Sequence, residues 1–64
     1  MFTLITINFS GVELIQTAPI SKDRIKPIYE SYIKRCLYGF PDIAEIRIVN
    51  ENGETVTSFF NWRR

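Results

Sequence analysis

Few residues of this sequence could do covalent or acid–base chemistry, and their spacing does not bring them together. Histidine, the usual base near neutral pH, is absent. The single cysteine, Cys36, falls on an apolar helical stripe, where a free cysteine is most often a small buried side chain. A zinc site needs more thiolate or imidazole ligands than this chain has. We therefore expect no metal site and no reactive thiol.

The carboxylates do not form a catalytic pattern either. No two of them have the spacing of a pair that shares a proton, and the near neighbours Asp42 and Glu45 flank a junction between a helix and a strand. The glycines Gly11, Gly39 and Gly53 stand singly at turn or cap positions, so none builds a phosphate-binding loop. We expect a protein that is not an enzyme and that needs no cofactor.

Basic residues gather in the middle of the chain, although the net charge is only +1. Lys26, Glu30 and Lys34 are spaced four apart, so on a helix they would form a ladder of alternating charge. Such a ladder is typical of a solvated face. The alternative is a nucleic-acid-binding surface, for which the candidate residues are Arg24, Arg35, Arg63 and Arg64.

An amphipathic helix must position these charges. The apolar residues recur with steps of three and one from Ile25 to Leu37, which is a helical stripe. Ser21 or Asp23 could cap its start, and a start near Asp23 keeps Pro27 close to the first turn. Gly39, with Pro41 after it, predicts the end.

Two strand-like pairs flank the helix. Residues 2–9 and 12–17 are rich in β-branched and aromatic side chains, and Ser10-Gly11 between them favours a turn. Residues 43–49 and 55–62 form a second pair around a loop that contains Gly53. The chain is therefore predicted to contain two hairpins, one on each side of the helix.

The order ββαββ predicts one small α+β domain over residues 1–64, a two-layer sandwich of one helix on a four-stranded sheet. The first and last strands are the longest and most apolar, so we place them centrally. The resulting order 2-1-4-3 is that of β-grasp domains, an analogy of fold alone. An all-antiparallel order 2-1-3-4 stays open.

The segment 58–64, SFFNWRR, is the strongest candidate for a binding surface. Phe59 and Phe60 are consecutive, so in a strand they point to opposite faces. If Phe60 and Trp62 lie under the helix, Phe59 lies on the face that the helix leaves open, and we expect Phe2, Leu4 and Ile15 on that open face too. Exposed apolar and Trp–Arg clusters mark interfaces. The predicted partner-binding residues are Phe2, Leu4, Ile15, Phe59, Trp62, Arg63 and Arg64.

The sequence favours a protein–protein interaction module, an accessory or inhibitory protein that binds a larger partner of unknown identity. Its size and layout suggest a phage or mobile-element origin, as a hypothesis. The apolar second sheet face predicts a homodimer. The first apolar run is too short for a signal peptide or a membrane span, and one cysteine permits no disulfide framework within a chain, so we expect a cytoplasmic protein with no membrane contact.

Overall fold

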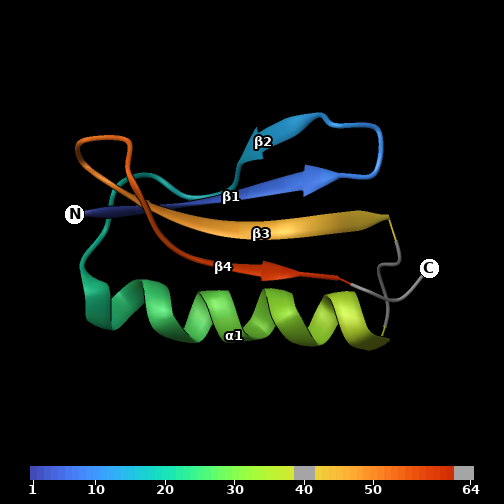
Figure 1. The fold of residues 1–64 in the computed structure, drawn as a ribbon. Helices are drawn as coiled ribbons and strands as arrows, with labels where there is room; N and C mark the ends of the chain where they lie inside the picture. The colour runs from blue at the N-terminus through green and yellow to red at the C-terminus, as the bar shows by residue number, and fades with distance from the viewer. Residues whose placement is uncertain (39–41, 62–64) are drawn as a thin grey trace.

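A computed structural model of the protein describes residues 1–38 and 42–61. The elements are β1 (Phe2–Asn8), β2 (Glu13–Ile15), α1 (Lys22–Tyr38), β3 (Ile43–Asn50) and β4 (Thr55–Phe60). The four strands form one antiparallel sheet, and the helix lies along one of its faces (Figure 1). The predicted α+β sandwich of ββαββ order is confirmed.

The strand order is β2-β1-β3-β4, so the alternative order is correct and the favoured 2-1-4-3 is wrong. A helix of 17 residues is about 25 Å long and returns the chain to the far end of the sheet, so β3 runs opposite to β1. With β3 beside β1 every neighbouring pair is antiparallel, whereas β4 beside β1 would be parallel. The polar residues Thr55, Thr57 and Ser58 also suit β4 to an edge.

Both hairpin loops are stabilised in the same way, by an asparagine side chain that accepts hydrogen bonds from backbone N–H groups of the loop. The Oδ1 atom of Asn8 accepts hydrogen bonds from the backbone N–H groups of Ser10 and Val12, at 2.9 and 3.0 Å. Asn50 repeats this pattern with Asn52 and Glu54, at 2.9 and 3.0 Å. The third residue after each asparagine is a glycine at positive φ, 85° and 79°, where a side chain would be strained. The motif Asn-x-x-Gly therefore sets both turns.

The helix begins one residue before the favoured position. The carbonyl of Ser21 accepts hydrogen bonds from the N–H groups of Arg24 and Ile25, at 3.1 and 3.0 Å, so Ser21 is the cap and Lys22 the first helical residue. The helix runs on through Pro27 as a single element. The predicted end at Gly39 and Pro41 lies outside the described residues.

The core lies between the helix and the two central strands. Its buried apolar residues come from all three elements: Leu4, Ile25, Cys36, Ile46 and Ile48. The helix packs on β1 and β3, the two central strands of the sheet. This placement leaves both edge strands, β2 and β4, less covered by the helix than the central strands, which matters for the surfaces described next.

Candidate protein-binding site

The register of the sheet decides which side chains face the helix. Residues directly opposite each other in antiparallel strands point to the same face. Leu4 lies opposite Ile48, and Phe59 opposite Ile46, so both point towards α1 together with the buried isoleucines. Phe2 packs against the same core.

The predicted placement of three candidate residues on the open face is therefore wrong. Leu4 has no exposed surface, and Phe2 and Phe59 pack against the core on the helix side of the sheet. The reason is that β1 carries apolar residues at both phases of its alternation, so burying one set leaves the other exposed. Ile15 lies on the open face as expected, and Phe60 takes the place that Phe59 was given.

Two rows of side chains carry the charged and exposed apolar groups of the open face, the side of the sheet away from α1. One row runs across the four strands through Ile15, Ile5, Arg47 and Ser58. The next row runs through Glu13, Ile7, Glu45 and Phe60. Apolar groups thus stand on both flanks of a charged centre.

The charged centre is a chain of three side chains. Nε of Arg47 donates to Oε2 of Glu45 at 3.0 Å, and Nη2 of Arg47 lies 3.3 Å from Oε1 of the same carboxylate. Arg47 also reaches across β1 to Glu13, with 3.8 Å between Nη1 and Oε1. The hydrogen bond to Glu45 is the main cause that raises the pKa of Arg47. The cluster carries net charge −1 and joins β2 to β3 across β1.

Two apolar side chains on this face are open to solvent. Ile15 is 74% exposed and Phe60 is 49% exposed. They belong to the two edge strands, so they stand on opposite sides of Arg47 and Glu45, which lie on β3. Trp62, Arg63 and Arg64, which were also predicted to bind a partner, lie outside the described residues.

The cations proposed for nucleic-acid binding do not form one cluster on the helix. Arg24 is exposed near the start of α1. Arg35 lies over the ring of Tyr32, with 5.1 Å from its Cζ atom to the ring centroid. Arg63 and Arg64 lie outside the described residues, and nucleic-acid binding stays a prediction.

Tyr32 ties the helix to the sheet on the β2 side. Its hydroxyl donates to Oε1 of Gln16 at 3.1 Å, and Nε2 of Gln16 donates to Oγ1 of the buried Thr6 at 2.9 Å. This polar chain links α1, the segment after β2, and β1. It also satisfies a hydroxyl that would otherwise be buried without a partner.

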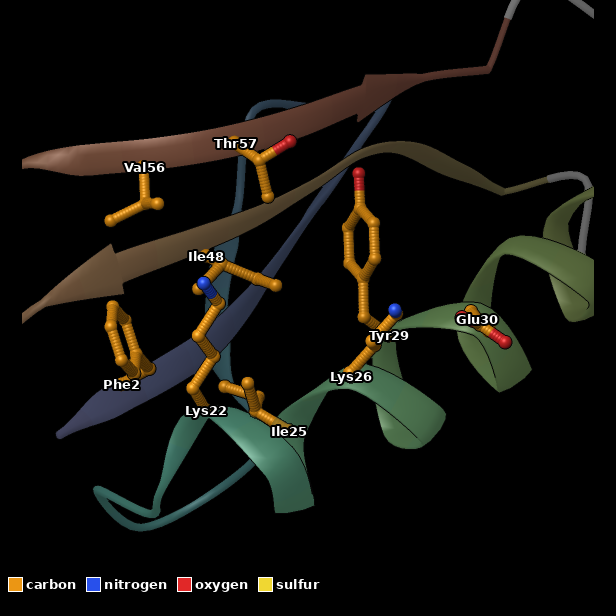
Figure 2. A pocket seen from close by; sticks show the side chains of 9 residues that line it. All are labelled: Phe2, Lys22, Ile25, Lys26, Tyr29, Glu30, Ile48, Val56 and Thr57. Carbon is orange, nitrogen blue, oxygen red and sulfur yellow. The ribbon is translucent and has the colours of Figure 1, made fainter.

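A second surface, which the sequence did not indicate, is the hollow between α1 and β4. It has a volume of about 350 Å³ and is lined mainly by apolar side chains from the helix, β1, β3 and β4 (Figure 2). We call it the α1–β4 groove. It lies on the helix side of the sheet, opposite the open face.

The structure agrees with the prediction that Cys36 is a small buried side chain of the core. The side chain is 4% exposed, and burial, with a smaller contribution from Asp42, raises the pKa of the thiol. A raised pKa favours the protonated form, which is a poor nucleophile. In the part of the chain that the structure describes, no three acidic or cysteine side chains gather into a metal-binding group.

No helix among the described residues has the length and apolar character needed to cross a membrane. Comparisons of the protein with family models, with curated proteins and with solved structures gave no significant match. The geometry of the surfaces is therefore the ground on which a function is proposed.

Proposed function

We propose that the protein is a non-catalytic binding module whose open sheet face is covered by another protein. The observation that carries this proposal is the exposure of Ile15 and Phe60 beside the half-buried Ile5 and Ile7 on one face of the sheet. Apolar groups gathered on one face of a small domain mark an interface more often than scattered ones do.

The charged centre of the open face adds specificity to a contact whose area comes from the apolar side chains. Arginine and aromatic residues are enriched where binding energy concentrates. Arg47 is held in place by two carboxylates, so a partner meets it with little loss of side-chain freedom. Because the cluster has net charge −1, a partner with a cation or N–H donors at this point complements it best.

The size of the domain limits how such a contact is made. A standard interface buries about 800 Å² on each partner. The described structure has a total accessible surface of 4547 Å², so a standard contact would cover most of one face. Binding of a larger protein in this way would make the molecule an accessory or inhibitory protein.

A second copy of the chain is the simplest partner to test. In a symmetric dimer the same patch meets itself. The two net-negative clusters must then lie offset from each other, with Ile15 or Phe60 of one copy over the apolar flank of the other. An unlike partner does not have this constraint.

The neighbours Leu14 and Ile15 provide a matched pair of variants for the test. Both belong to β2 and both are exposed, at 55% and 74%, but they point to opposite faces of the sheet. Ile15→Lys places a charge on the open face, and Leu14→Lys places the same charge on the helix side. Each variant leaves the buried core intact.

The experiment combines sedimentation velocity with affinity capture from the native host. If the open face binds protein, Ile15→Lys abolishes self-association or the capture of specific partners, and Leu14→Lys keeps them. A monomer at every concentration, together with a captured set that Ile15→Lys does not change, would refute the proposal.

A further inference from the structure

The α1–β4 groove lies where the edge strand β4 extends beyond the helix, which packs on the two central strands. On the other side of the helix, the hydrogen-bond chain from Tyr32 through Gln16 to Thr6 joins α1 to β1 and to the segment after β2. The helix packs on β1 and β3, and β4 lies beyond its cover. Val56 and Thr57 of β4 therefore face a hollow on the helix side.

An irregularity in β4 adds an apolar side chain to this hollow. Ile48 pairs with Thr57 and the next residue, Val49, pairs with Thr55, so Val56 is an extra residue on β4. Val56 and Thr57 both line the groove, and Val56 is 55% exposed. The bulge thus turns Val56 towards the groove and leaves it accessible.

The floor and walls of the groove are apolar. Phe2, Ile25 and Ile48 approach it from β1, α1 and β3, and Val56 completes it from β4 (Figure 2). A volume of about 350 Å³ lies at the lower end of the range of small-molecule pockets, which is about 300–1,000 Å³. The hollow is larger than a single methyl-sized packing defect.

The mouth of the groove is positively charged. Lys22 and Lys26 line it from the helix, and neither has a carboxylate within 4.0 Å among the described residues. Figure 2 shows Lys22 extending from the helix towards the strands, whereas the side chain of Glu30 points away from them. A ligand with a negative group at this mouth would meet two cations.

We propose that the α1–β4 groove binds a small amphiphile, an aliphatic chain that ends in a carboxylate. The chain replaces water against Phe2, Ile25, Ile48 and Val56. The carboxylate lies at the mouth beside Lys22 and Lys26, where the charges are complementary and the head group stays partly solvated. This binding is independent of the open face, which lies on the other side of the sheet.

The probe is decanoate, kept below its micelle-forming concentration and titrated into the ¹⁵N-labelled protein. Decyltrimethylammonium has the same chain and the opposite charge, so it serves as the control ligand. We expect saturable amide shifts with decanoate at Ile25, Ile48 and Val56, unchanged amides at Ile15, and at least threefold weaker binding of decyltrimethylammonium.

Variants separate the contribution of the chain from that of the head group. Lys22→Glu should weaken decanoate binding about threefold to tenfold, in keeping with the strength of exposed charge pairs. Lys34→Glu makes the same charge change on the same helix at a residue that does not line the groove, so affinity should change less than twofold. Val56→Asp, at an exposed position, should weaken binding at least tenfold.

Three results would overturn the proposal. The first is the absence of saturable shifts, and the second is shifts confined to the open face. The third is equal binding of the two probes together with equal effects of Lys22→Glu and Lys34→Glu. Should Val56→Asp fail to fold, the pair of lysine variants still decides. A failed titration leaves the proposed protein contact untouched, because Ile15 does not line the groove.

Discussion

Replacing Leu4 with alanine tests which face of the sheet the helix covers. Leu4 is fully buried on the helix side of β1. Leucine-to-alanine changes at buried sites cost about 3–5 kcal/mol, from lost apolar burial plus the cavity. A domain of 64 residues is stable by about 3–10 kcal/mol, so this one change removes a large part of its stability.

Ile15→Ala is the control on the opposite face of the neighbouring strand. Full burial of an isoleucine side chain is worth about 1.5–3 kcal/mol. Ile15 is 74% exposed, so only about a quarter of that, roughly 0.5 kcal/mol, depends on it. The two variants should therefore differ in stability by more than 2 kcal/mol.

The assay is urea unfolding followed by circular dichroism. With a slope of about 1 kcal/mol per molar urea, the midpoint should fall by about 3 M for Leu4→Ala and by about 0.5 M for Ile15→Ala. If Leu4→Ala is unfolded in buffer, Ile48→Val, with an expected cost of about 1 kcal/mol, takes its place. An equal or greater loss for Ile15→Ala would refute the assignment of the two faces.

Two further predictions concern the helix. Because proline has no N–H, the carbonyl of Asp23 lacks its helical donor, and Pro27→Ala should stabilise the protein by about 2 kcal/mol, measured by urea unfolding; an unchanged midpoint contradicts it. Burial raises the pKa of Cys36 in the folded state, so the folded state favours the protonated thiol and stability falls as the pH rises above about 8.5. Cys36→Ala should lose this part of the pH dependence in unfolding curves from pH 7 to 10, and an identical pH profile speaks against it.

The elements themselves could be predicted from local patterns. The apolar steps from Ile25 to Leu37 predicted α1, and the turn signals at Gly11 and Gly53 predicted both hairpins. These signals are local, because each depends on residues within one element. The helix start moved only from Asp23 to Lys22.

Strand order and facing depend on comparisons between elements, and there the sequence was ambiguous. Phe59 and Phe60 made β4 look apolar enough for a central strand. The polar residues of the same strand, Thr55, Thr57 and Ser58, indicated an edge strand, which is what the structure has. In β1 both alternating sets are apolar, so the pattern cannot choose the face that the helix covers. In the structure the helix covers the face that was expected to be open. Leu4 is therefore buried, and the exposed phenylalanine is Phe60, where Phe59 was expected.

The binding surfaces were only partly accessible to sequence reasoning. Ile15 was placed correctly, but the cluster of Arg47 with Glu13 and Glu45 joins β2 and β3 across β1 and depends on the true strand order. The α1–β4 groove depends on how the helix packs on the sheet and on the bulge at Val56, and no local pattern encodes either.

The matching Asn-x-x-Gly turns have a consequence for the route by which the chain folds. Each turn closes through bonds made by its own asparagine, so each hairpin can form from neighbouring residues alone. The pairing of β1 with β3 joins Phe2 to Asn50, close to opposite ends of the chain, and pays the largest loop-closure entropy. The docking of the two preformed hairpins, which α1 connects, is therefore the slow step of folding. Substitutions at the β1–β3 pairing should slow folding more than substitutions in either turn.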